Sequence, residues 1–203
     1  QHVELGHLGI TETVDLRAAK NGDPCGRCGG KFKFFRGIEV GHVFFLGTKY
    51  SEPMKCHVLN DDGQETPMVM GCYGIGITRI MAAAIEQNHD KFGIQWPVPL
   101  TPWEAIVLPL NGDDDEVVGL ANRYYAELRE AGIEVVLDDR DLRPGGKFKD
   151  ADLIGFPFHL VIGKRGLKDG NVEVKDRRTG DKKVLPIDAA AAYVIEAVKE
   201  ART

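Results

Sequence analysis

A proline-rich segment divides the chain and limits what either side of it can fold into. Three prolines fall within six residues in the run Trp96-Pro97-Val98-Pro99-Leu100-Thr101-Pro102. Each proline ring removes a backbone donor and disfavours helix at the residue before it. We therefore predict a linker over residues 96–103, with one structural unit over residues 1–95 and another over residues 104–203.

The unit before the linker has the pattern of antiparallel strands. Apolar residues alternate with other residues over positions 38–47. Two shorter runs, 55–59 and 66–70, flank the turn-forming sequence Asn60-Asp61-Asp62-Gly63. A period of two and a turn of this composition predict strands and a hairpin.

The unit after the linker alternates strands with helices. Its expected strands lie at residues 105–110, 134–137 and 159–162, its expected helices run from Asp113 to Gly132 and over 147–154, and a hairpin over 172–185 precedes a last helix capped by Asp188. This order predicts a mixed, mostly parallel sheet with helices packed against it. The fold class is therefore α/β, an antiparallel sheet followed by an α/β domain.

Charge and composition restrict the kinds of function. The net charge is −5, and residues 104–203 hold 16 Lys and Arg against 20 Asp and Glu. Binding to DNA or RNA through a general positive field is thus not expected, and any RNA contact must rest on a local cluster. The least polar stretch, 68–85, carries Arg79 and three glycines, which argues against a membrane span. Four cysteines without a secretion signal predict a soluble, cytoplasmic protein.

The most informative motif is Gly71-Cys72-Tyr73-Gly74-Ile75-Gly76-Ile77-Thr78-Arg79. We predict a glycine-rich turn over residues 71–76, which opens a helix reaching about Asn88. A dinucleotide fingerprint is excluded because Arg79 stands where its third glycine should be. The glycines would let a flat purine ring approach the sheet, and the arginine could hold phosphate through two parallel hydrogen bonds. Taken alone, the motif fits a tight turn with a solvated arginine equally well.

A second cluster lies in the segment from Leu137 to Gly155. It combines basic side chains, interleaved aspartates and one aromatic ring that we expect to be exposed: Arg140, Arg143, Lys147, Lys149, Asp138, Asp152 and Phe148. Stacking on a ring and donors to base edges suit single-stranded RNA. On these residues alone, a solvated loop of mixed charge is the simpler interpretation.

The run Cys25-Gly26-Arg27-Cys28 has the spacing of half a zinc site. No second pair of this kind exists, Cys56 and Cys72 are isolated, and the sequence identifies no further ligands. A reduced thiol pair in a turn is preferred to zinc at Cys25 and Cys28, and no metal ligand is assigned.

Residues 71–79 resemble the third signature motif of class II aminoacyl-tRNA synthetases. They depart from the general pattern at Cys72 and Thr78, and both departures are typical of the prolyl branch. The run Arg36-Gly37-Ile38-Glu39-Val40-Gly41-His42-Val43-Phe44-Phe45-Leu46-Gly47-Thr48-Lys49-Tyr50-Ser51 resembles the same branch. Residues 137–155 resemble the anticodon-binding domain shared by prolyl, threonyl, histidyl and glycyl synthetases. From about Asp15 onward, the chain is thus similar to the C-terminal part of a bacterial-type prolyl-tRNA synthetase.

The resemblance implies roles for individual residues. Arg79 would be the catalytic residue that contacts the γ-phosphate of ATP, with Gly74 and Gly76 making room for adenine and Thr48 lying near ATP. His42 and Cys72 would line the proline pocket and Glu39 would support it. The residues that would read the guanines of a proline anticodon are Asp138, Arg140, Arg143, Lys147, Phe148 and Asp152.

The resemblance also implies an activity and its partners. The parent enzyme would be a homodimer that activates L-proline with ATP and Mg²⁺, and then transfers the prolyl group to tRNA(Pro). Residues 71–88 would form motif 3 and residues 1–14 the end of the editing insertion. The sequence shows neither motif 1 nor motif 2, so we expect part of a longer enzyme, inactive by itself. The alternative is a non-catalytic RNA-binding accessory module derived from a class II synthetase, which leaves Arg79 and His42 unexplained.

Overall fold

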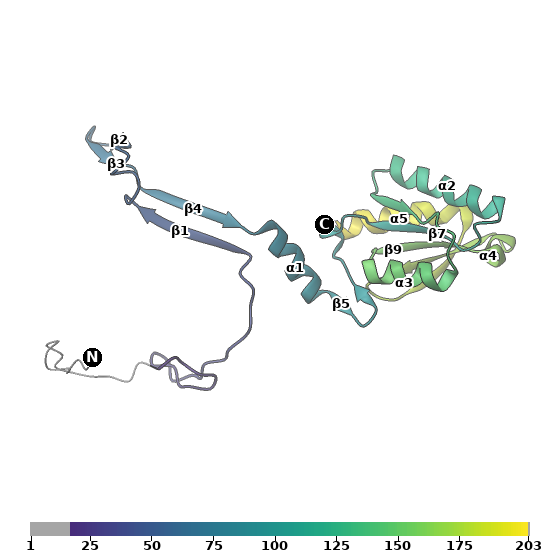
Figure 1. Cartoon of the computed structure of the whole chain (residues 1–203), viewed down its shortest axis with the longest axis horizontal. Helices are drawn as coiled ribbons and strands as arrows, with labels where there is room; N and C mark the ends of the chain where they lie inside the picture. The colour runs from purple at the N-terminus through teal and green to yellow at the C-terminus, as the bar shows by residue number, and fades with distance from the viewer. Residues whose placement is uncertain (1–16, 203) are drawn as a thin grey trace, which may run out of the picture. The chain divides into compact units, whose positions relative to one another are not determined.

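The computed structural model describes residues 17–202 (Figure 1). The predicted end of an editing insertion, at residues 1–14, lies outside these residues. The chain divides into two compact units, residues 1–39 and residues 40–203.

The described part of the first unit contains a turn built by main-chain hydrogen bonds. The Cys25 N–H donates to the Gly30 carbonyl at 2.6 Å, and the Gly29 N–H donates to the Cys25 carbonyl at 3.1 Å. A bridge between Pro24 and Lys31 closes the turn at its base. The two cysteines are therefore brought together by the backbone itself.

The second unit begins with a pair of antiparallel strands, β1 (Gly41–Gly47) and β4 (Met70–Ile75). The prediction of a glycine-rich turn over residues 71–76 is wrong, because residues 71–75 belong to β4. Pairing with β1 gives the backbone groups of these glycine-containing residues their hydrogen-bond partners. Helix α1 (Ile77–Gln87) then starts where the sequence predicts it, after Gly76.

Two short hairpins and one turn of 3₁₀ helix make up the rest of this part of the chain. Strands β2 (His57–Leu59) and β3 (Glu65–Pro67) form the predicted hairpin, and the Asn60 side chain accepts from the Asp62 and Gln64 N–H groups in its turn. A second, unpredicted hairpin of β5 (His89–Asp90) and β6 (Gly93–Ile94) follows α1. In the proline segment, only one turn of 3₁₀ helix forms, η2 (Val98–Leu100).

The remaining elements, β7 to α5, form an α/β domain around a five-stranded sheet, in the order β11-β10-β9-β7-β8. Strand β7 pairs in parallel with β8 and β9, whereas β10 is antiparallel to both β9 and β11. This confirms the α/β class with a mixed sheet. The bounds are β7 (Ala105–Pro109), α2 (Asp115–Glu130), β8 (Val135–Leu137), α3 (Pro144–Ile154), β9 (Phe158–Ile162), α4 (Lys164–Lys168), β10 (Asn171–Asp176), β11 (Lys182–Pro186) and α5 (Ile187–Ala201).

Helices cover both faces of this sheet (Figure 1). Helices α2 and α5 pack on one face and form the larger apolar core, and α3 packs on the other over a smaller cluster around Leu108 and Phe156. Tyr124 lies in the larger core, where its hydroxyl donates to the Ile187 carbonyl at 2.7 Å. Burial raises the pKa of Tyr124 to about 12.

Three helix boundaries follow from capping chemistry. Helix α2 begins after Asp114, whose carboxylate accepts from two N–H groups, and ends before Gly132, which has a φ of 76°. Helix α3 starts at Pro144, three residues before the prediction, because proline fits the first helical position. The prediction that Asp188 caps α5 is wrong, since Asp188 lies inside the first turn after Pro186.

Candidate functional site

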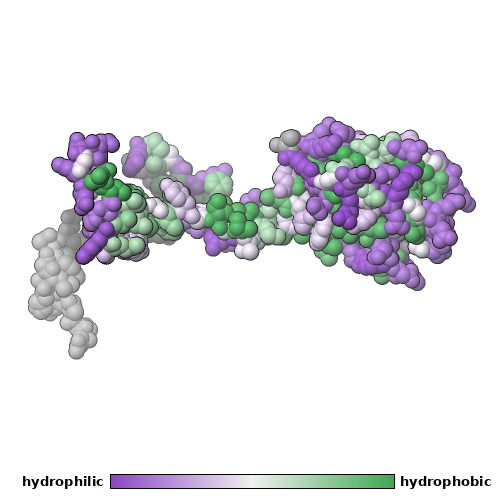
Figure 2. Space-filling model, turned by 90° about the horizontal axis from the view of Figure 1, so that it is seen from above, coloured by the Kyte–Doolittle hydropathy of each residue, from purple (hydrophilic) through white to green (hydrophobic). Residues whose placement is uncertain are grey.

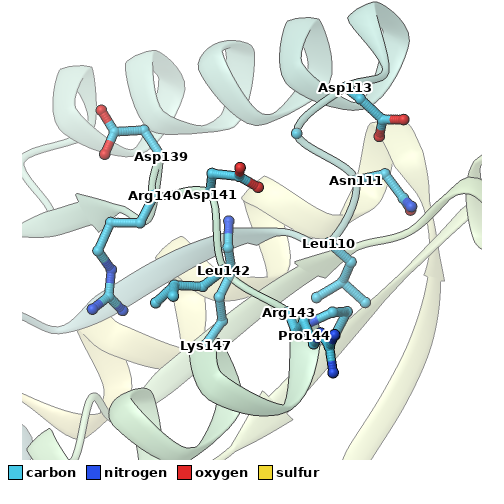
Figure 3. Close-up of a pocket in the computed structure, with 11 residues that line it drawn as sticks. Leu110, Asn111, Asp113, Asp139, Arg140, Asp141, Leu142, Arg143, Pro144 and Lys147 are labelled. Carbon is cyan, nitrogen blue, oxygen red and sulfur yellow. The ribbon is translucent and has the colours of Figure 1, made fainter.

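A hollow of about 420 Å³ opens where β7 and β8 end (Figure 3). Residues 110–113 follow β7, residues 139–144 follow β8, and Lys147 reaches into it from α3. The chain leaves β7 toward β8 on one side and returns to β9 on the other, so the hollow lies at the switch point of the sheet. Ligands of open α/β sheets bind at such places.

The hollow is lined by equal numbers of acidic and basic side chains. Its lining includes Asp113, Asp139 and Asp141, together with Arg140, Arg143 and Lys147. Carboxylates accept from base amino groups and guanidinium groups donate to base edges. This set suits hydrogen bonding to bases more than attraction of a phosphate backbone. The three aspartates and Asn111 were not among the predicted site residues, although each lies within four residues of the end of a predicted strand.

Arg140 and Asp138 form a fork at the edge of the hollow. The arginine Nε and Nη2 atoms donate to the two oxygens of Asp138, each at 2.9 Å, and Nη1 donates to Asp150 at 2.9 Å. These hydrogen bonds lower the pKa of Asp138 and raise that of Arg140. The Asp138 carboxylate is buried and occupied by this contact, while the Arg140 side chain remains half exposed.

Lys147 is buried and holds two strand ends together. Its Nζ donates to the carbonyl oxygens of Pro109 and Asp138, both at 2.9 Å, and only 2% of the residue is exposed. These carbonyls lie at the ends of β7 and just beyond β8. The structure therefore gives Lys147 the role of shaping the hollow, whereas Arg143 is exposed at its rim.

Phe148 lies in the wall of a second hollow, of about 340 Å³. The expectation of an exposed ring is wrong: Phe148 is half-buried against the smaller apolar cluster. Phe148 lies on the side of α3 that packs against this cluster. Leu110 lines both hollows, so they adjoin. Across the second hollow, Glu173 and Lys182 are paired at 2.9 Å.

Asp152 lines neither of these two hollows. It lies near the other end of α3, where its carboxylate accepts from Lys175 at 2.5 Å. Of the six residues predicted to read an anticodon, the structure thus places Arg140, Arg143 and Lys147 around one hollow and Phe148 beside the next. Asp138 and Asp152 are held by basic neighbours.

The residues predicted to bind ATP and proline lie mostly along β1 and β4. His42 is opposite Gly74, and Phe44 is opposite Cys72, so these four share one face of the strand pair. The His42 and Phe44 rings stack with centroids 3.8 Å apart. Glu39 lies two residues before the strand, outside it.

Gly76 and Arg79 meet at the start of α1. The Gly76 N–H donates to the Val40 carbonyl at 2.9 Å, and a Cβ added at Gly76 would lie 3.2 Å from the Arg79 Cβ. Glycine thus leaves room for the arginine. Thr48 follows the opposite end of β1, about 20 Å along the strand from His42, and its hydroxyl donates to Glu52 at 2.8 Å. The strand pair does not bring Thr48 to Arg79.

The cysteine turn provides two sulfur atoms only. No group of three His, Cys, Asp or Glu side chains that could hold a metal ion occurs within residues 17–202. Backbone N–H groups of Arg27 and Cys28 lower the pKa of Cys25.

Within residues 17–202, no helix has the length and apolar character needed to span a bilayer.

Two family models match the chain. The class II core domain of the G, H, P, S and T tRNA synthetases matches residues 18–88, and the anticodon binding domain matches residues 104–197. Two matching relatives are the proline–tRNA ligase of Syntrophotalea carbinolica, 54% identical over 95% of this chain, and that of Aquifex aeolicus, 49% identical over 93%. The chain spans about a third of their length, 34% and 33% respectively.

Among solved structures, prolyl-tRNA synthetase from Cryptosporidium parvum, complexed with L-proline and AMP, matches with a TM-score of 0.72 and 21% identity. The match covers 81% of this chain and 34% of that protein, and it shows the fold alone. Fold and site together define part of a class II aminoacyl-tRNA synthetase core followed by an anticodon-binding domain. Within that class, the chain belongs to the prolyl-tRNA synthetase family.

Proposed function

We propose that the chain is part of an enzyme that joins L-proline to tRNA(Pro) at the expense of ATP, and that it reads the anticodon. The observation that supports anticodon reading is the hollow at the switch point of the sheet, which has equal numbers of acidic and basic lining residues (Figure 3). Single-stranded RNA is recognised through splayed bases that stack and form hydrogen bonds at their edges. The two adjoining hollows provide an apolar wall and donors and acceptors for this purpose.

For the ligase reaction, we propose that His42 and Cys72 face proline and that Glu39 supports this pocket. We propose that Gly74, Gly76 and Arg79 face ATP. Arg79 would then be the catalytic residue, holding phosphate charge in the transition state. The shared face of His42, Cys72 and Gly74 supports this assignment. Thr48 is also proposed to lie near ATP, but this strand pair does not bring it to Arg79, so the rest of the catalytic domain would have to complete that part of the site. Mg²⁺ is proposed to enter with ATP as part of the substrate.

The strand pair and α1 expose large hydrophobic side chains, and Figure 2 shows aliphatic and phenylalanine residues in green. Phe45, Tyr73, Ile75 and Ile77 are between 69% and 83% exposed. We propose that the rest of a class II catalytic domain covers this face in a cytoplasmic homodimer. The division into a catalytic part at residues 1–95, a linker at 96–103 and an anticodon-binding domain at 104–203 belongs to the same proposal. The 203-residue chain alone is expected not to form prolyl-adenylate.

The test is binding of a transcribed tRNA(Pro) to this chain, compared with a transcript whose anticodon guanines are replaced, at two salt concentrations. We expect the intact anticodon to bind at least tenfold more tightly, since each well-placed pair of hydrogen bonds is worth about 1–3 kcal/mol. The preference should persist at the higher salt, where backbone contacts weaken. Equal affinity for both transcripts would contradict the proposal.

A further inference from the structure

The β5–β6 hairpin follows α1 directly and precedes the proline segment that leads into the α/β domain. Helix α1 ends at Gln87, Asn88 caps it, and β5 begins at the next residue. The hairpin is closed by Asp90, whose Oδ1 accepts from the Phe92 and Gly93 N–H groups at 2.8 and 3.1 Å. The Gln95 N–H returns to the Asn88 carbonyl at 2.8 Å. The position of the hairpin therefore determines where α1 ends.

Arg177, just after β10, grips this hairpin. Its Nη1 and Nη2 atoms donate to the two oxygens of Asp90 at 2.9 and 2.7 Å. Its Nε donates to the main-chain carbonyl of Asp152 at 3.2 Å. Only 4% of Arg177 is exposed, so the guanidinium is held in a fixed, largely water-free place. A two-pronged contact of this kind fixes orientation as well as distance.

Close packing at the end of α3 completes the contact. The Trp96 Nε1 donates to the Ile154 carbonyl at 3.0 Å, and Trp96 is 8% exposed. A Cβ added at Gly155 would lie within 2.5 Å of the Ile94 carbonyl oxygen, and one at Gly93 would overlap the backbone of Leu153. The hairpin and the end of α3 thus meet backbone to backbone, with no side chain between them.

Helix α3 carries this contact at one end and the candidate RNA site at the other. Pro144 and Lys147 in its first turn line the hollow, while residues 152–155 meet Arg177 and the hairpin. The helix has 11 residues, a length of about 16 Å. A rigid helix of this length links the two ends without an intervening loop.

We propose that Arg177 is a positioning residue: by clamping Asp90 to the end of α3, it holds α1, which carries Arg79, in a fixed place relative to the anticodon-reading hollow. This proposal rests on the proposed function, which assigns ATP binding to the region of Arg79 and anticodon reading to the hollow. The clamp would keep the ATP-facing helix and the RNA-facing helix in a fixed relative orientation, because along the chain α1 reaches the α/β domain only through the hairpin and the proline segment.

Electron-spin distance measurements on the full 203-residue chain test the clamp. The four cysteines are replaced by serine, and labels are attached through Glu86→Cys on α1 and Glu130→Cys on α2. We expect a single narrow distance distribution in the parent and at least a doubling of its width in Arg177→Gln. In a Trp103→Phe background, Trp96 fluorescence should shift to longer wavelength in the same variant, because the indole loses its buried site.

Arg178→Gln is the matched control, since it removes the same charge from the neighbouring, exposed residue and should leave the width unchanged. Should Arg177→Gln fail to fold, Asp90→Asn weakens the clamp from the hairpin side, outside the α/β core. A parent distribution as broad as that of the folded variants would overturn the proposal. No RNA is present in this measurement, so its failure is distinguishable from failure of anticodon binding.

Discussion

Arg202, at the end of α5, binds Glu104, which directly precedes β7, through two hydrogen bonds of 2.5 and 2.6 Å. The same carboxylate accepts from the Glu134 N–H at 3.0 Å, and Glu104 is 6% exposed. The Arg202 Nη2 also donates to the Gly132 carbonyl at 2.9 Å. One arginine thus fastens the end of the α/β domain to its first strand and to the loop before β8.

Removing this arginine should destabilise the α/β domain. Arg202→Ala leaves the nearly buried Glu104 carboxylate with fewer partners, but the arginine itself is partly exposed and its contact is screened by solvent. We expect a loss of about 1–2 kcal/mol in the free energy of unfolding. Urea unfolding followed by circular dichroism measures it. Lys199→Ala, which breaks an exposed pair with Glu196, is the control and should cost less than about 0.5 kcal/mol.

Lys147 should behave as a structural residue. Lys147→Met keeps the aliphatic length but leaves the buried carbonyls of Pro109 and Asp138 without their donor. We expect a loss of about 2 kcal/mol in stability, measured by the same urea titration. Lys149→Met, on the exposed side of α3, should change stability by less than about 0.5 kcal/mol. Equal effects of the two substitutions would show that the buried contact contributes nothing.

Stability should fall on acidification because of His159. Burial, followed by the charge of Lys175, lowers its pKa from 6.5 to about 4, while Asp152 opposes this and Arg177 adds to it. Between these two pH values the unfolded chain binds a proton that the folded chain does not. Stability therefore rises with pH across this window, by about 3 kcal/mol in all.

Thermal unfolding at steps between pH 4 and 7 measures this dependence. His159→Phe should flatten the profile, whereas His57→Gln, at an exposed position, should not. Asp90 adds a separate pH dependence in more acidic solution. The hydrogen bonds from Arg177 lower the pKa of Asp90 in the folded chain, so the stability from this ion pair is lost only as the pH falls below 3.8, the ordinary pKa of an aspartate. An unchanged profile in His159→Phe would contradict the assignment.

Arg143 is expected to contact RNA directly. Its side chain lines the hollow from an exposed position and makes no capping hydrogen bond to α3. Arg143→Gln should weaken tRNA(Pro) binding by about tenfold and reduce the preference for the intact anticodon. Lys149→Gln removes the same charge from outside the hollow and should change the affinity by less than about twofold. A filter-binding titration of both variants with both transcripts decides the matter.

The elements with strong local signals could be predicted from the sequence. Asp114 and Gly132 bracket α2 with capping chemistry, and the apolar runs of β7 and β9 stand between clear breaks. Strand β4 was missed because its glycines have low strand propensity, and its partner β1 lies about 30 residues earlier along the chain. A pairing that is distant in sequence cannot be seen in a local pattern.

The candidate site shows the same limit. Lys147 and Arg143 are both basic residues at a helix start, and nothing in their neighbours distinguishes them. The acceptors that bury Lys147 are 9 and 38 residues away in the chain. Likewise, Asp90 and Arg177 are 87 residues apart, and neither carries a motif. Tertiary contacts decide which charges are available to a ligand.

The balanced lining of the first hollow has a consequence for selectivity among the many RNAs of a cell. Three carboxylates stand against three cations there, so an arbitrary polyanion gains little by approaching. Abundant competitors such as ribosomal RNA would therefore dissociate quickly rather than occupy the surface. Under the proposed function, only an anticodon loop that presents the right base edges would remain bound for long. Discrimination would then depend on the dissociation rate more than on the association rate.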